Sequence, residues 1–91
     1  MTEVVRDLPI VNEKGLHARA SAKFAEVCEA YEARVTVEKD GRAVCGDSIM
    51  GLLMLVAPRG SSIRITTRGP DAEALADALA ALVANRFGEG R

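Results

Sequence analysis

Aromatic residues and surplus positive charge are both scarce in this sequence. Of its 91 residues one is Tyr, two are Phe and none is Trp, and 12 Lys and Arg stand against 13 Asp and Glu for a net charge of −1. Proteins that bind nucleic acid usually combine a basic face with aromatic side chains that stack on bases. The composition therefore argues against a nucleic-acid partner.

Long apolar runs are lacking as well. Arg6 and Asp7 interrupt the apolar residues near the N-terminus, so we expect no signal peptide there. No segment of the sequence approaches the roughly 20 apolar residues that span a bilayer. The sequence predicts a cytoplasmic protein that does not insert into membranes.

Cysteine is rare, because the chain contains only Cys28 and Cys45, and their spacing matches no metal-binding or CxxC pattern. We interpret both as small hydrophobic core residues in a reducing compartment. We expect no metal site and no cofactor.

The length is that of one domain, and we expect residues 1–91 to form it, with residues 88–91 as a flexible tail. Alternation of apolar and polar residues predicts four strands, with Val4, Leu8 and Ile10 facing inward on the first of them. Pro9 cannot donate to a strand ladder, which indicates a strand at the sheet edge. Asp40 and Gly41 predict a hairpin turn. The predicted strands cover residues 3–11, 33–39, 42–45 and 61–68.

Three further segments favour helix, namely residues 18–31, the apolar run 49–55, and the segment from Asp71 to Gly88. Ser48 and Asp71 are the residue types that cap helix N-termini. The apolar stripes that we expect to face the core are Ala18, Ala22, Ala25 and Cys28 with Phe24, Val27 and Tyr31 in the first helix, and Leu75, Leu79, Leu82 and Val83 with Ala72 and Ala76 in the last.

This order of elements, β-α-β-β-α-β-α, predicts an α/β (α+β) fold. A right-handed crossover through the first helix makes the first two strands parallel. If the last strand fills a gap between them, the result is a mainly antiparallel four-stranded sheet with three helices on one face, a two-layer open-faced sandwich of split βαβ type. We expect the other face to be solvated, with Thr36, Glu38, Arg64 and Thr66 on it.

One short stretch carries the residues for chemistry. His17 is the sole histidine, Gly15 precedes it by two residues and Arg19 follows it by two. The composition beyond His17 favours helix, so the imidazole should lie at a helix N-terminus, where free backbone N–H groups attract anions. A neutral imidazole is nucleophilic near pH 7, and a guanidinium pairs well with phosphate oxygens. These residues together indicate a group that carries phosphate.

A second motif begins at Ser48. This serine can serve both as a helix cap and as a site of phosphorylation, and the two interpretations do not exclude each other. The apolar residues after it cannot all be buried on so short a helix, so we expect some of them to form an exposed surface for partners beside His17. The residues that we assign to this surface are Ile49, Met50, Leu53 and Met54.

With both motifs in place, the chain resembles the histidine-containing phosphocarrier family, HPr, of the bacterial phosphoenolpyruvate-dependent phosphotransferase system. The resemblance rests on Gly15-Leu16-His17-Ala18-Arg19 and on Asp47-Ser48-Ile49-Met50-Gly51-Leu52. It implies that His17 accepts a phosphoryl group from phospho-enzyme I and passes it to enzyme IIA domains, with Gly15, Ala18 and Arg19 stabilising the phosphate.

The resemblance also implies that an HPr kinase/phosphorylase modifies Ser48. We expect a monomer that is not an enzyme but is phosphorylated as an intermediate. One residue departs from the family pattern, because Ala20 stands where a proline usually follows the arginine. Proline presets the backbone of a first helical turn, so we expect a slightly less rigid helix start here.

Three other interpretations are compatible with the sequence. The first is a nitrogen-branch or purely regulatory phosphocarrier of the same family. The second is a ferredoxin-like domain that binds a ligand or nucleic acid. The third is a small acid–base enzyme, which would need a carboxylate within reach of His17, and no such residue is near it in the sequence.

Overall fold

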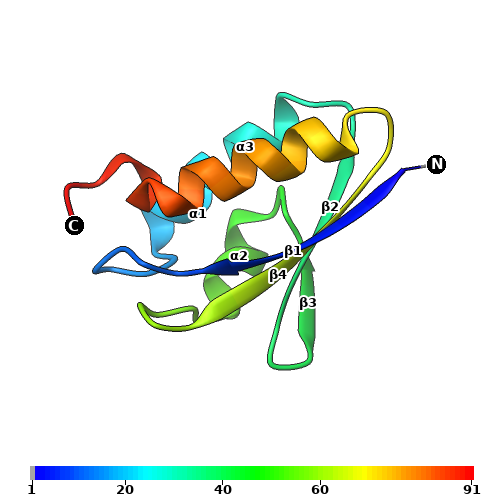
Figure 1. Cartoon of the computed structure of the whole chain (residues 1–91). Helices are drawn as coiled ribbons and strands as arrows, with labels where there is room; N and C mark the ends of the chain where they lie inside the picture. The colour runs from blue at the N-terminus through cyan, green and yellow to red at the C-terminus, as the bar shows by residue number, and fades with distance from the viewer. Residues whose placement is uncertain (1) are drawn as a thin grey trace.

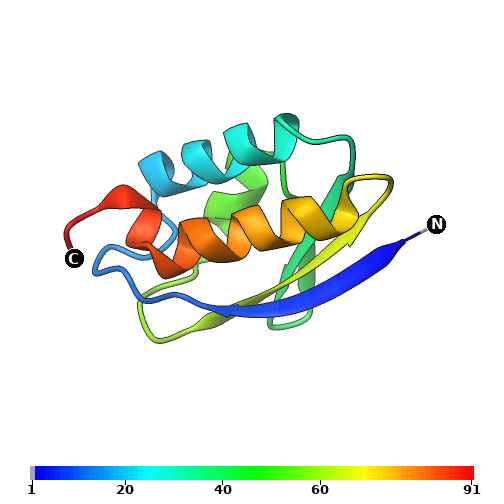
Figure 2. The same cartoon turned by 45° about the horizontal axis from the view of Figure 1, so that its top comes forward.

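The computed structural model describes residues 2–91. In Figures 1 and 2, helices α1 and α3 run side by side over the sheet, and α2 is a shorter third helix. The elements in chain order are β1 (Glu3–Pro9), α1 (Ala18–Glu29), β2 (Arg34–Lys39), β3 (Arg42–Cys45), α2 (Ile49–Met54), β4 (Ser62–Arg68), α3 (Ala72–Ala84) and the 3-10 helix η1 (Arg86–Gly88). The predicted order of elements and the open-faced sandwich are confirmed.

The four strands form one sheet in the order β1-β4-β2-β3, and every neighbouring pair is antiparallel. Strand β4 lies between β1 and β2, so these two run in the same direction without touching. Pro9 is on an edge strand, opposite Ser62. The turn from β2 to β3 places Asp40 at φ 51° and Gly41 at φ 79°. The edge position of β1 and the hairpin are therefore as predicted.

The inward row of β1 contains one charged residue, Arg6. Leu8 and Ile10 are buried and Val4 is half-buried. Arg6 is also half-buried, and its guanidinium donates to the carboxylate of Asp77 on α3 over 2.8 Å. The aliphatic stem of an arginine can cover apolar surface while its charged end reaches a partner, which explains how a cation fits into this row.

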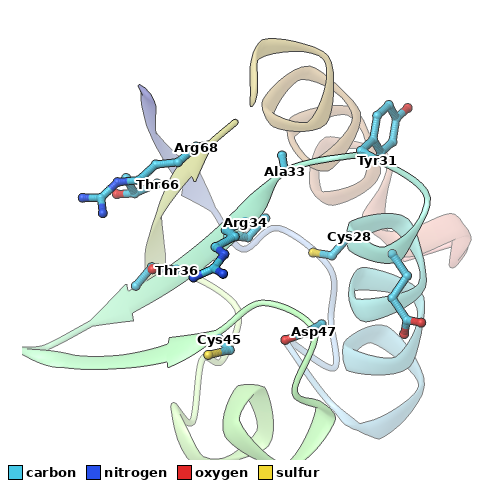
Figure 3. Close-up of a pocket in the computed structure, with 11 residues that line it drawn as sticks. Cys28, Tyr31, Ala33, Arg34, Thr36, Cys45, Asp47, Thr66 and Arg68 are labelled. Atoms are coloured by element: carbon cyan, nitrogen blue, oxygen red, sulfur yellow. The ribbon is translucent and has the colours of Figure 1, made fainter. Parts of the chain in front are cut away.

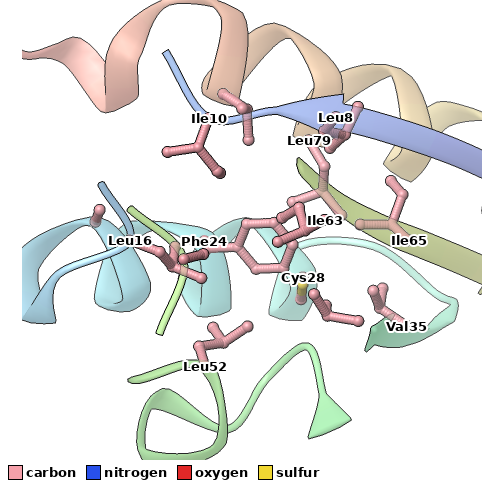
Figure 4. Close-up of a cluster of buried hydrophobic side chains, with 14 of the residues drawn as sticks. Leu8, Ile10, Leu16, Phe24, Cys28, Val35, Leu52, Ile63, Ile65 and Leu79 are labelled. Atoms are coloured by element: carbon pink, nitrogen blue, oxygen red, sulfur yellow. The ribbon is translucent and has the colours of Figure 1, made fainter. Parts of the chain in front are cut away.

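The core lies between the sheet and the helices (Figure 4). Phe24 of α1, Leu52 of α2, Leu79 of α3, and Ile63 and Ile65 of β4 have exposed fractions of 1% or less. Burying each such side chain stabilises the fold by about 1.5–3 kcal/mol. On the opposite face of the sheet Thr36, Glu38 and Arg64 are exposed and Thr66 is half-buried, as predicted.

Helix α1 is turned relative to the predicted stripe and ends two residues early, at Glu29. Its buried residues are Ala20, Ser21, Phe24, Ala25 and Cys28, whereas Ala18 is exposed and Ala22 is only half-buried. Phe24, the largest of these side chains, determines how α1 is rotated about its axis. Ala20 and Cys28 lie one turn before and one turn after Phe24 on the same side of the helix, so this side packs against the core.

The C-terminal helix ends earlier than predicted. Helix α3 stops at Ala84, and the left-handed backbone of Arg86 (φ 56°) and Phe87 (φ 55°) turns the chain back. Phe87 is fully buried, while Leu82, which we expected in the stripe, is only half-buried. Asp71 does occupy the N-cap position of α3, but its carboxylate accepts from the backbone N–H of Glu32 over 2.8 Å and makes no capping bond.

The two cysteines differ, which corrects the prediction that both are core residues. Cys28 is buried on the inner side of α1, and Cys45 is exposed at the end of β3. Figure 3 shows both on the wall of a hollow that Arg34, Arg68 and Asp47 also line. Alternation along β3 sends the side chain of Cys45 to the open face of the sheet.

Candidate functional site

His17 is the N-cap residue of α1, with an extended backbone (φ −80°, ψ −176°). Its carbonyl oxygen accepts the first helical hydrogen bond, from the N–H of Ser21 over 2.8 Å. Its ring nitrogen Nδ1 accepts from the backbone N–H of Arg19 over 3.3 Å. The side chain is 25% exposed. The imidazole thus faces the first turn of a helix and is still reachable from solvent.

The loop before His17 is held against the segment that follows α2. Gly15 has φ +66°, and a Cβ built on it would lie 2.5 Å from the carbonyl oxygen of Ala57. Next to it, the N–H of Leu16 donates to the same carbonyl over 2.9 Å. Two features therefore require glycine at position 15, a left-handed backbone conformation and the close approach of the backbone at Ala57.

Arg19 and Ala18 are exposed on the first turn of α1. Arg19 lines a shallow hollow together with Lys14 and Arg91, and two glutamates, Glu13 and Glu89, complete it. The three cationic side chains outnumber the two carboxylates, and with the positive end of α1 they make this neighbourhood suitable for an anion.

The structure adds one residue that sequence reasoning missed. The carboxylate of Glu89 contacts Nε2 of His17, although 72 residues separate them. Its other oxygen accepts from the side-chain amide of Asn12 over 2.9 Å. The hydrogen bond from Asn12, and next the one with His17, hold the pKa of Glu89 below its ordinary value. No local pattern signals such a contact, because it depends on how the chain returns after α3.

Ser48 caps helix α2 as predicted, and its hydroxyl accepts from the backbone N–H of Gly51 over 3.0 Å. We call the exposed apolar residues of this region the α2 surface. Ile49 is 44% exposed, Met50 70% and Met54 56%, whereas Leu53 is half-buried. Val56, 70% exposed with a left-handed backbone, extends the surface and was missed. The contact between Leu16 and Ala57 brings this region next to the loop of His17.

Residues 2–91 lack two features that would point to other kinds of function. No helix in this part of the chain is both long and apolar enough to cross a bilayer. Within the same residues, no group of three or more His, Cys, Asp or Glu side chains is arranged to hold a metal ion.

The sequence model described as the PTS HPr component phosphorylation site matches residues 4–85. The phosphocarrier protein HPr of Cupriavidus necator is 49% identical over 85 residues, which cover 93% of this chain and 96% of that protein. The phosphocarrier protein NPr of Shewanella violacea is 38% identical over 89 residues, covering 98% of each.

Solved structures agree with the sequence comparisons. The crystal structure of HPr-C-His from Thermoanaerobacter tengcongensis superimposes with a TM-score of 0.89 at 35% identity, over 100% of both chains. The HPr of Bacillus anthracis gives a TM-score of 0.86 at 40% identity, over 91% of this chain and 99% of that one. Both sequence identities are higher than a shared fold alone would require. The chain belongs to the HPr family of phosphocarrier proteins of the phosphotransferase system, which carry a phosphoryl group and are not enzymes.

Proposed function

We propose that His17 is the phosphoacceptor, that it receives a phosphoryl group from phospho-enzyme I, and that it passes the group to enzyme IIA domains in the cytoplasm. The observation that carries the proposal is the placement of Nδ1 of His17 at the start of α1, 3.3 Å from the N–H of Arg19. A lone pair directed at this helix end can form a bond to phosphorus where backbone N–H groups are ready to receive the phosphate oxygens.

The step is a displacement at phosphorus. The lone pair of Nδ1 forms the N–P bond, and the bond from phosphorus to the donor breaks with its electron pair leaving on the donor. Formation of the N–P bond breaks the hydrogen bond from the N–H of Arg19 to Nδ1 and frees that N–H group. The N–H groups of Ala18 and Arg19, which have no carbonyl acceptor within the helix, are then available to the phosphate oxygens. The guanidinium of Arg19 supplies a charged donor on the same side. Gly15 contributes indirectly, by the turn that precedes the ring.

The strength of these interactions suits a carrier. A charge near a helix end is stabilised by about 0.3–1 kcal/mol, and by ~2 kcal/mol in a partly buried site. This is enough to steady the phosphoryl group and too little to trap it. Rapid release is as necessary for a carrier as acceptance.

The α2 surface is the docking site in this proposal. Two methionines among its exposed residues adapt to differently shaped partners, as a protein that must bind both donor and acceptors requires. We expect a transient interface of less than ~1,200 Å², formed by a monomer.

The test is phosphorylation by enzyme I and phosphoenolpyruvate. We expect an acid-labile, base-stable phosphate that is absent from His17→Ala and present in Ser48→Ala, the matched control. A label that persists in His17→Ala would overturn the proposal. Comparing transfer rates from the sugar-branch and nitrogen-branch enzyme I identifies the branch.

We propose in addition that an HPr kinase/phosphorylase modifies Ser48. The half-buried hydroxyl caps α2 immediately before the exposed Ile49 and Met50. A phosphate adds about −1.5 to −2 charge there, which would repel an acidic partner from the α2 surface. The expected result is ATP-dependent, acid-stable labelling that is lost in Ser48→Ala and that slows later transfer to His17. An unchanged rate of transfer after labelling would refute the regulatory role.

A further inference from the structure

A chain of hydrogen bonds runs through His17 from one side of the ring to the other. The side-chain amide of Asn12 donates to one oxygen of Glu89, the second oxygen of Glu89 contacts Nε2 of His17, and Nδ1 accepts from the N–H of Arg19. The side chain of Glu89 is 17% exposed and Asn12 is fully buried. This arrangement is part of the packed structure and not a chance contact of two surface groups.

The backbone after α3 holds Glu89 in place. Phe87 is fully buried, and its carbonyl oxygen accepts from the ammonium of Lys23 on α1 over 2.6 Å. The N–H of Glu89 donates to the carbonyl of Arg86 over 2.9 Å, and beyond it the carbonyl of Arg91 accepts from the N–H of Glu13 over 3.1 Å. The backbone is thus hydrogen-bonded on both sides of Glu89, whereas the sequence predicts a flexible tail over residues 88–91.

The side chain of Asn12 holds the carboxylate of Glu89 through the oxygen that does not contact His17. Its amide nitrogen donates to the carbonyl of Gly15 over 2.8 Å as well as to Glu89. Both partners are acceptors, so the NH2 end of Asn12 must face them. The carboxylate of Glu89 is ionised at neutral pH, because the ordinary pKa of 4.5 already lies below 7 and the hydrogen bond from Asn12 lowers it further. An ionised carboxylate only accepts hydrogen bonds.

The two contacts of the imidazole select the same tautomer. A neutral imidazole has one N–H and one lone pair. The carboxylate of Glu89 requires the hydrogen on Nε2, and the N–H of Arg19 requires the lone pair on Nδ1. The nitrogen left free of hydrogen is the one that faces the helix N-terminus.

We propose that Glu89 is a positioning residue for phosphoryl transfer, which keeps the proton of His17 on Nε2 and so presents Nδ1 as the nucleophile. This inference rests on the proposed function of His17. When the N–P bond forms at Nδ1, the ring gains positive charge, and the carboxylate at Nε2 stabilises it. In the onward step the N–P bond breaks, its electrons return to Nδ1, and the ring leaves as neutral imidazole with the Nε2 proton still in place. The carboxylate therefore serves acceptance and release.

The test measures both the tautomer and the rate. In the whole chain with ¹⁵N-labelled histidine, at a pH where the ring is neutral, Nε2 should show the shift of a protonated nitrogen and Nδ1 that of a bare one. Glu89→Gln should give a mixture of tautomers and an initial rate of phosphorylation by enzyme I about ten-fold lower, at the low end of the loss found when a metal-binding histidine loses its orienting partner. The matched control is Glu13→Gln, which removes the same charge from the same hollow without touching the ring.

The outcomes separate this inference from the proposed function. The role of Glu89 is overturned if wild-type His17 accepts phosphate but carries its hydrogen on Nδ1. It is also overturned if Glu89→Gln and Glu13→Gln have the same rate and the same tautomer, and in both cases the proposal that His17 is the phosphoacceptor stands. If His17→Ala is still labelled, the proposed function itself fails. A wild-type hydrogen on Nδ1 overturns the role of Glu89 even if a variant folds poorly, and Asn12→Ala should shift tautomer and rate in the same direction as Glu89→Gln.

Discussion

A Cβ on Gly15 would lie 2.5 Å from the carbonyl oxygen of Ala57, a distance at which one of the two backbones must move. Gly15 also has φ +66°, which L side chains rarely adopt. We expect Gly15→Ala to lower the free energy of unfolding by roughly 2–4 kcal/mol, through backbone strain and overpacking together. Urea denaturation measures the change.

The control for this prediction is Gly41→Ala. Gly41 has a similar backbone (φ +79°) but nothing within 4 Å of the added Cβ. Strain alone should cost about 1 kcal/mol there. Equal losses at both positions would show that the approach of Ala57 contributes nothing.

The cap of α2 can be tested through stability. Ser48→Ala removes the hydrogen bond to the N–H of Gly51 and should destabilise the fold by about 1 kcal/mol. Ser48→Asp keeps an acceptor at the cap and should retain the stability of the wild type to within ~0.5 kcal/mol. Thermal or urea unfolding distinguishes the two, and an Asp variant as unstable as the Ala variant would contradict the capping role.

The α2 surface should affect binding and not stability. Met50 is 70% exposed, so Met50→Glu should change the free energy of unfolding by less than ~0.5 kcal/mol. The KM for transfer from enzyme I should rise about ten-fold, the loss of ~1.4 kcal/mol of binding energy. Val5→Glu is the control, because Val5 is 52% exposed on the edge strand β1. A similar KM for both variants would place the docking site elsewhere.

Glu89 predicts a dependence of stability on pH. Its pKa in the folded protein is lowered, first by the hydrogen bond from Asn12 and then by that with His17, from an ordinary value of 4.5. A carboxyl group whose pKa is lowered by folding stabilises the folded protein at pH values above the pKa of the unfolded chain. This stabilisation is lost as the pH falls through the pKa of the folded protein. Below pH 4.5 the stability of Glu89→Gln should therefore fall less steeply than that of the wild type. Urea denaturation across this range measures it, and Glu13→Gln should follow the wild-type curve.

The cysteines should react at different rates. Burial on the inner side of α1 raises the pKa of the Cys28 thiol to about 12. Cys45 is exposed. Titration of the native protein with dithionitrobenzoate should label Cys45 alone, with Cys28 reacting only after unfolding, since the thiolate is the reactive form. The Cys45→Ser variant should show no labelling before denaturant is added.

Much of the fold follows from local patterns. Alternation in the strands, the Asp40-Gly41 turn and the cap at Ser48 depend on neighbours in the sequence, so residue types alone determine them. The position of His17 at the start of α1 is of the same kind. The topology of the sheet also followed, because the handedness of a crossover through a helix leaves few arrangements.

The local sequence patterns did not predict for every helix and strand which side faces the core. Both Ala18 and Ala20 are small apolar residues in α1, and only packing against the rest of the core decides that Ala20 is buried and Ala18 is exposed. Cys45 was assigned to the core on residue type, but the pleat of β3 directs it to the solvated face. In each case the residue type fits both environments.

The sequence by itself determined that an imidazole stands at the start of α1, because a histidine, a glycine turn and an arginine within five residues are a local arrangement. Tertiary structure alone decided the partner of that imidazole. Glu89 reaches His17 only because Phe87 is buried and the chain turns back after α3. Contacts between residues 72 positions apart are set by the packing of the elements between them, and no local pattern encodes that packing.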